Sequence, residues 1–96
     1  MKIGFIGTGK IASSVITGIC NSKISFTKIL ISSRNKKVAN KLKKKFKRVI
    51  IGKNNQKIID NCDWIFLSVT PMVGQKIIKE LKFNSNQTII SFISTI

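Results

Sequence analysis

Short apolar runs alternate with longer stretches in which apolar residues recur every three or four positions. Apolar runs that end at glycine, proline or polar residues are typical of buried parallel strands, and the helical spacing is typical of amphipathic helices packed on them. The predicted strands are Lys2–Ile6, Lys28–Ile31, Val49–Ile51, Trp64–Val69 and Thr88–Ile93. The predicted helices are Lys10–Asn21, Lys36–Lys47, Asn55–Asn61 and Val73–Lys82.

This strict alternation predicts one α/β domain without an internal boundary. Short connections between parallel strands require right-handed crossovers, which favour a doubly wound sheet with strand order 3-2-1-4-5, the Rossmann type. The order reverses between the first and fourth strands. Because ligands of such sheets bind beyond the carboxyl ends of the strands at that reversal, we expect a site at the turns after Ile6 and Val69.

The turn after the first strand carries a glycine pattern of the kind that binds dinucleotides, GxGxxA. Its members are Gly7, Thr8, Gly9, Lys10, Ile11 and Ala12. Gly7 permits the tight turn, Gly9 allows the backbone to approach a diphosphate, and Ala12 allows the helix to lie close to the sheet. The helix N-terminus then faces the anion. The alternative is a glycine turn that only packs a helix closely.

The end of the second strand indicates which dinucleotide is bound. An acidic residue there accepts hydrogen bonds from a free ribose 2'-hydroxyl, whereas this chain has Ser32, Ser33 and Arg34. A guanidinium and serine hydroxyls suit a 2'-phosphate, so Ser33 and Arg34 favour NADP(H) over NAD(H). The alternative is that Arg34 is an ordinary surface arginine.

The end of the fourth strand lies beside the glycine turn at the predicted reversal. Its residues Ser68, Val69, Thr70 and Pro71 would border the nicotinamide ribose through their backbone. The alternative is a simple strand stop at Pro71, and Trp64 and Asp63 at the other end of this strand are predicted to be structural.

The formal charge of +15 raises the possibility of a nucleic-acid or anionic-membrane partner. However, the lysines are spread from Lys2 to Lys82, and the dense cluster Lys41–Lys47 lies within an amphipathic helical pattern. We therefore expect a solvated helix face and neither of those partners. Cys20 and Cys62 are isolated and the chain has no histidine, so we expect buried thiols and no metal site.

The first segment has no signal-peptide core, and no apolar run is long enough to span a membrane. We therefore expect a cytoplasmic protein.

The segments MKIGFIGTGKIASSVITGI, ISSRN and DWIFLSVTP resemble the amino-terminal domain of pyrroline-5-carboxylate reductase. The resemblance implies hydride transfer from NAD(P)H to the C=N bond of pyrroline-5-carboxylate, giving L-proline. It also implies that Ser33 and Arg34 contact the 2'-phosphate and that Asn55 contacts the cofactor. Two departures are Thr70, where the family usually has lysine, and Phe92 to Ile96, where the family has small residues and glycine.

In the family, a helical carboxyl-terminal domain forms the dimer and the imino-acid site. We therefore expect residues 1–96 to be a partial NAD(P)-binding domain that binds NADP(H) weakly and has no reductase activity by itself, and no catalytic side chain is assigned. The imino acid would be a partner only where a second domain is present. Two alternatives stay open: a non-catalytic NADPH-binding regulatory module, and the nucleotide domain of another enzyme such as an F420-dependent NADP reductase.

Overall fold

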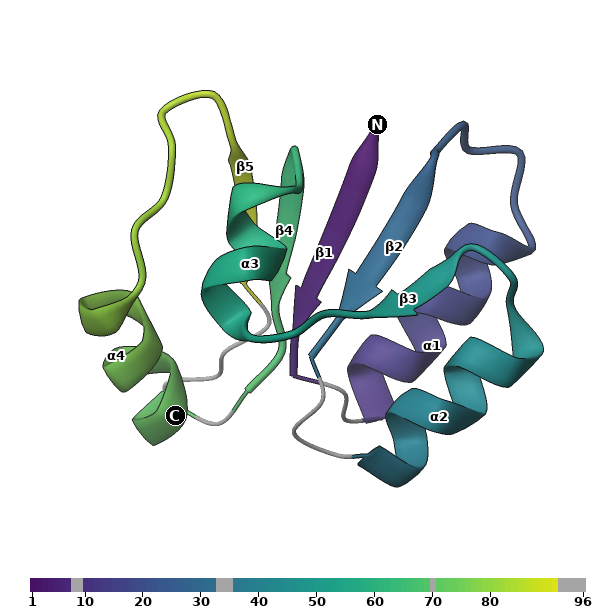
Figure 1. Cartoon of the computed structure of the whole chain (residues 1–96), viewed down its shortest axis with the longest axis horizontal. Coiled ribbons are helices and arrows are strands. Elements are labelled where there is room, and N and C mark those ends of the chain that lie inside the picture. The colour runs from purple at the N-terminus through teal and green to yellow at the C-terminus, as the bar shows by residue number, and fades with distance from the viewer. Residues whose placement is uncertain (8–9, 33–35, 70, 92–96) are drawn as a thin grey trace.

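The computed structural model describes residues 1–7, 10–32, 36–69 and 71–91, without the side chains of residues 10, 71 and 73 (Figure 1). Strands and helices alternate along these residues, as the hydrophobic pattern predicts. The strands are β1 (Lys2–Ile6), β2 (Lys28–Ile31), β3 (Val49–Ile51), β4 (Trp64–Leu67) and β5 (Thr88–Ser91). The helices are α1 (Lys10–Cys20), α2 (Lys36–Lys45), α3 (Asn55–Asp60) and α4 (Pro71–Glu80).

The five strands form one parallel sheet in the order β3-β2-β1-β4-β5, which confirms the predicted topology. In the centre of the sheet, Phe5 of β1 pairs with Ile31 of β2 and with Phe66 of β4. Since every strand runs in the same direction, the carboxyl ends of β1, β2 and β4 meet at one edge (Figure 1). That edge contains the predicted site.

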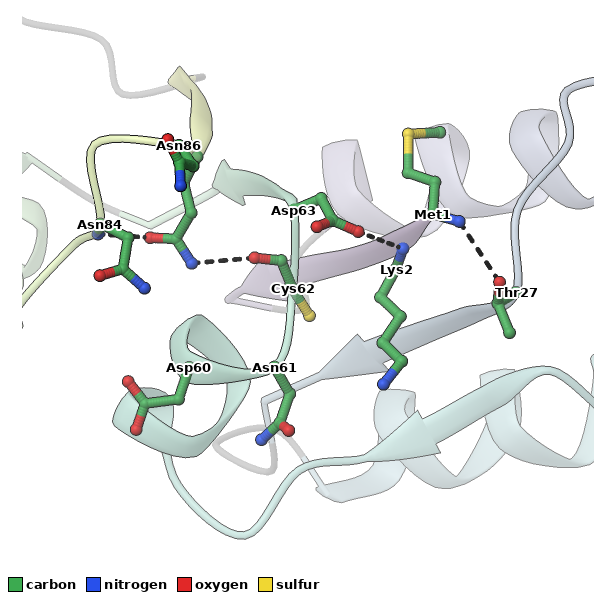
Figure 2. A pocket seen from close by; sticks show the side chains of 10 residues that line it. Met1, Lys2, Thr27, Asp60, Asn61, Cys62, Asp63, Asn84 and Asn86 are labelled. Carbon is green, nitrogen blue, oxygen red and sulfur yellow. Dashed lines mark hydrogen bonds between the residues drawn. The ribbon is translucent and has the colours of Figure 1, made fainter.

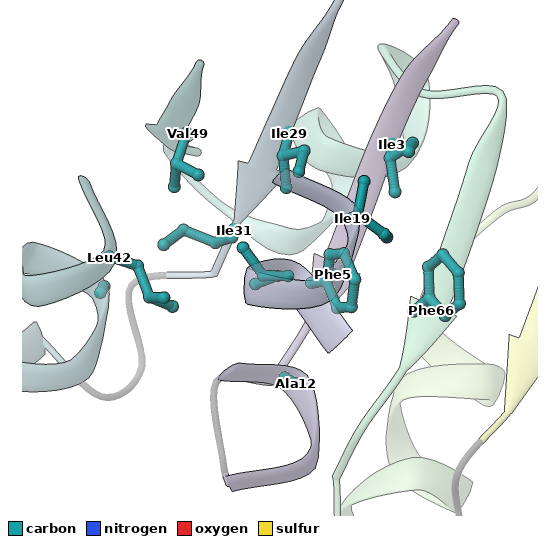
Figure 3. Packing of buried hydrophobic residues seen from close by; sticks show 11 residues of the cluster. Ile3, Phe5, Ala12, Ile19, Ile29, Ile31, Leu42, Val49 and Phe66 are labelled. Carbon is teal, nitrogen blue, oxygen red and sulfur yellow. The ribbon is translucent and has the colours of Figure 1, made fainter. Parts of the chain in front are cut away.

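One face of the sheet is covered by α1 and α2. Alternate strand residues point to this face, and the rings of Phe5 and Phe66 stack there with centroids 4.6 Å apart (Figure 3). Ala12 and Ile16 of α1 and Leu42 of α2 are buried against them. A fully buried isoleucine, leucine or phenylalanine side chain contributes roughly 1.5–3 kcal/mol to the free energy of unfolding, so this layer is a main source of stability.

The other face is covered by α3 and α4, and two strand glycines allow α3 to come close. A Cβ atom at Gly4 would lie 2.7 Å from Ile58 Cγ2, and one at Gly52 would lie 2.4 Å from Ile58 Cγ1. Ile58 is fully buried as a result, and Ile59 beside it is 1% exposed. Both side chains belong to the apolar cluster between α3, α4 and the sheet.

Several element ends differ from the predicted ones. Helix α4 begins at Pro71 instead of Val73, because proline fits the first helical position, where no intrahelical N–H bond is needed. It ends at Glu80 because the backbone of Lys82 exchanges hydrogen bonds with the side chain of Gln56. Strand β4 ends at Leu67, two residues before the predicted end.

Three other helices are also shorter than predicted, by one or two residues each: α1 ends at Cys20, α2 at Lys45 and α3 at Asp60. The end of α2 follows from the turn into β3, where Val49 N–H donates to the carbonyl of Phe46 at 3.2 Å. Phe92 and Ile93, predicted as the end of the last strand, lie outside the described residues.

The lysine cluster forms an exposed helix face, as predicted. Lys41, Lys43, Lys44 and Lys45 are exposed, while Ala39 and Leu42 of the same helix are buried. Among the described residues, no helix is long and apolar enough to cross a membrane, and no group of histidine, cysteine and acidic residues is arranged to hold a metal ion.

Candidate nucleotide-binding site

The glycine turn begins at Gly7, directly after β1. Gly7 has a φ of +98°, a conformation that residues with a side chain rarely adopt. An ideal Cβ atom at this position would lie 2.1 Å from the carbonyl oxygen of Ser68 and 2.8 Å from Cγ1 of Val69. Glycine is therefore required both by the backbone conformation and by the closeness of the residues that follow β4.

The same glycine is held from the other side by β2. Its N–H donates to Oγ of Ser32 at 2.9 Å, and Ser32 is only 5% exposed. The backbone N–H of Ser32 donates in turn to the carbonyl of Phe5 at 3.1 Å, so β2 stays paired with β1 up to the start of the turn. After β2, the sequence assigns cofactor contacts to Ser33 and Arg34, and it does not reveal this role of Ser32. The sequence does contain a signal for it, because Ser32 is a polar residue that directly follows a buried strand.

The end of β4 completes the site where the strand order reverses, between β1 and β4. The N–H of Ser68 donates to the carbonyl of Ile6 at 2.9 Å, and Ser68 and Val69 are both half-buried beside Gly7. Gly7 of the glycine turn and the two residues after β4, Ser68 and Val69, are therefore adjacent in space although about 60 residues separate them in the chain. Thr70 lies outside the described residues, and Pro71 begins α4.

Helix α1 begins at Lys10 within the glycine pattern. Ala12 is fully buried against the sheet, which is the role predicted for it, while the Ile11 side chain is 54% exposed. Ile11 lies off the buried line formed by Ala12, Ile16 and Ile19, so it adds nothing to the core. The first turn of α1 contains no acidic residue, so no carboxylate there neutralises the partial positive charge of the helix N-terminus.

The residues after β3 lie at the same edge of the sheet. Asn54 caps α3, because its side-chain oxygen accepts a hydrogen bond from Lys57 N–H at 2.8 Å. The neighbouring Asn55 occupies the first helical position, and its half-buried side chain is not the cap. The predicted contacts Thr8, Gly9, Ser33 and Arg34 lie outside the described residues.

Acidic side chains do not follow the strands at the edge that contains Gly7. The acidic side chains of the chain are Asp60, Asp63 and Glu80, and none of them directly follows the carboxyl end of a strand. Lys36, Lys37 and Lys53 are exposed near the ends of β2 and β3. The edge that contains Gly7 therefore favours an anionic ligand.

A polar pocket of about 400 Å³ lies at the opposite edge, where the strands begin (Figure 2). Asp63 accepts a hydrogen bond from Lys2 N–H at 2.9 Å, and Gln87 donates to the carbonyl of Cys62 at 2.8 Å. These bonds tie the starts of β1, β4 and β5 together, which is the structural role predicted for Asp63. Burial is the main reason that the pKa of Cys62 rises to about 11, with Asp63 as a second cause.

A doubly wound parallel sheet, with a positive-φ glycine where its strand order reverses and a helix N-terminus beside it, defines a Rossmann-type nucleotide-binding domain. Residues 2–95 match the family model described as NADP oxidoreductase, coenzyme F420-dependent. The chain belongs to this family. A comparison with curated proteins finds no match.

A solved structure described as 1-pyrroline-5-carboxylate reductase from the human pathogen Streptococcus pyogenes is similar in both sequence and fold. The identity is 32% and the TM-score is 0.79, and the match covers 100% of this chain and 35% of that one. This supports the resemblance found in the sequence. The chain spans about a third of the length of the reductase that it matches.

Proposed function

We propose that this chain binds NADP(H) at the edge that contains Gly7 and supplies the cofactor-binding part of a reductase. The observation that carries the proposal is the geometry of Gly7, where any side chain would collide with Ser68. In a dinucleotide-binding domain the first glycine makes the tight turn after the first strand, and N–H donors at the following helix N-terminus hold the diphosphate. Gly7, Gly9, Ala12 and the start of α1 would hold the diphosphate.

The preference for NADP(H) rests on the charge at the same edge. Ser33 and Arg34 directly follow the buried Ser32 in sequence, and no acidic residue follows β2 to accept a bond from a 2'-hydroxyl. Exposed Lys36 and Lys37 add positive potential to that of Arg34. Asn55, Ser68, Val69, Thr70 and Pro71 are proposed as further cofactor contacts.

The proposed reaction is that of pyrroline-5-carboxylate reductase, in which NADPH delivers a hydride to a cyclic imine. The likeness to the streptococcal enzyme over this whole chain supports this assignment. Hydride transfer requires cofactor and substrate to be held together, and that positioning contributes roughly 7–11 kcal/mol where it is well achieved. We therefore propose that residues 1–96 alone bind the cofactor without forming proline.

A second candidate is the nucleotide domain of an F420-dependent NADP reductase. The description of the matching family model favours it. Binding of coenzyme F420 to the NADPH-loaded chain would support this candidate over the first.

Titration with NADPH and NADH, followed by calorimetry, tests the cofactor assignment. NADPH is expected to bind more tightly, and Arg34→Ala is expected to weaken NADPH much more than NADH. Arg48→Ala is the matched control, because Arg48 lies at the opposite edge, where its guanidinium donates to the carbonyl of Phe26. Equal losses for both nucleotides in Arg34→Ala would remove the 2'-phosphate assignment, and a chain that binds neither nucleotide at millimolar concentration would contradict the proposed function.

A further inference from the structure

The N–H of Gly7 is already used within the protein. It donates to Ser32 Oγ at 2.9 Å in a buried position, so this amide is turned toward β2. The diphosphate must then be bound by the amides that follow Gly7. Ser32 fixes the direction in which the turn leaves β1, and it does so from the strand whose next residues are the predicted 2'-phosphate contacts.

We propose that Ser32 is a positioning residue that joins the diphosphate turn at Gly7 to the 2'-phosphate segment that begins at Ser33. The inference rests on the proposed function and deepens it. The two segments would bind the 5'-diphosphate and the 2'-phosphate of the same adenosine ribose, and the Ser32 hydroxyl links the end of β2 to the first residue of the turn. The buried Ser32 hydroxyl thereby holds the diphosphate turn and the 2'-phosphate segment in a fixed relative position before the cofactor binds.

The rest of the Gly7 environment explains why this bond matters. Ser68 and Val69 leave no room on the β4 side of Gly7, and the backbone of β2 remains paired with β1 through Ser32 N–H. Gly7 can therefore move only if its bond to Ser32 is lost. A buried N–H without an acceptor is costly, so in Ser32→Ala the turn rotates to find another acceptor, and binding must reverse that rotation.

The test compares Ser32→Ala with Ser22→Ala. Ser22 is a suitable control because its hydroxyl also accepts a backbone N–H, that of Ile24 at 3.1 Å, but at the far end of α1. Ser32→Ala is expected to weaken NADPH binding about tenfold, with a smaller loss for NADH, because NADH makes no use of the 2'-phosphate segment. Ser22→Ala is expected to bind both nucleotides as the unaltered chain does.

Two further measurements separate positioning from general destabilisation. Hydrogen exchange at the Gly7 amide, followed by NMR, is expected to be slow in the unaltered chain and at least tenfold faster in Ser32→Ala, while amides in the middle of β1 stay protected. Ser32→Thr, which keeps the hydroxyl, is expected to restore most of the NADPH affinity. If the unaltered chain binds NADPH but Ser32→Ala binds it within twofold, the positioning role is wrong and the proposed function stands. If the unaltered chain binds no NADPH, both are wrong.

Discussion

Replacement of Gly7 by alanine tests the geometry on which the site depends. The structure gives two independent reasons for a loss of stability. An alanine would have to keep a φ of +98°, and its Cβ would lie 2.1 Å from the carbonyl oxygen of Ser68, far inside van der Waals contact. That oxygen belongs to the backbone of a residue whose N–H is bonded to Ile6, so it cannot move without disturbing the pairing of β1 with β4.

The size of the effect follows from these two terms. The unfavourable backbone conformation costs about 1–2 kcal/mol, and the forced displacement of packed atoms costs roughly another 1–3 kcal/mol. The expected loss in the free energy of unfolding is therefore about 2–5 kcal/mol, a large share of the roughly 5–15 kcal/mol of an ordinary domain. For a chain of this size, such a loss lowers Tm by roughly 10–30 °C.

Urea unfolding followed by circular dichroism measures this loss, and Gly18→Ala is the matched control. Gly18 lies within α1, and a Cβ there would meet no atom within 4 Å, so alanine is expected to stabilise the chain by about 0.5–1 kcal/mol. Gly7→Ala is also expected to abolish measurable NADPH binding under conditions where it remains folded. An unchanged urea midpoint for Gly7→Ala would refute the steric reasoning, and unchanged NADPH binding would refute the placement of the cofactor.

Three other predictions concern Gly52 and the two cysteines. Gly52→Ala is expected to cost about 1–3 kcal/mol in urea unfolding, because its Cβ would lie 2.4 Å from Cγ1 of the fully buried Ile58; a smaller cost would show that α3 can move away freely. Because the pKa of Cys62 is about 11 in the folded chain and near 9.0 when unfolded, the unfolded state loses this proton first, and stability should fall as the pH rises from 9 to 11. Cys62→Ala should flatten that part of the pH profile, and a profile identical to that of the unaltered chain would contradict this. In the native chain at neutral pH, Ellman's reagent should modify the half-buried Cys20 before Cys62.

The hydrophobic pattern alone determined the fold of this protein. Short apolar runs such as Ile3 to Ile6, each ended by glycine or polar residues, are typical of strands that helices cover on both faces, so their alternation with amphipathic helices favours the doubly wound order. The glycine pattern at Gly7 was equally visible, because a tight turn between a strand and a helix requires that residue type. The ends of the elements do not follow from periodicity, because α4 begins where proline fits the first helical position and ends where the Gln56 side chain bonds the backbone of Lys82.

The tertiary structure alone decided what surrounds Gly7. The sequence places Ser32 and Ser68 at the ends of two different strands, and only the register of the sheet brings both against the same glycine. The tertiary structure also decided that Asn54, and not its neighbour Asn55, caps α3. The physical reason is that hydrophobic periodicity specifies which face of an element is buried, whereas a hydrogen bond between distant residues depends on distances that exist only after the strands have paired.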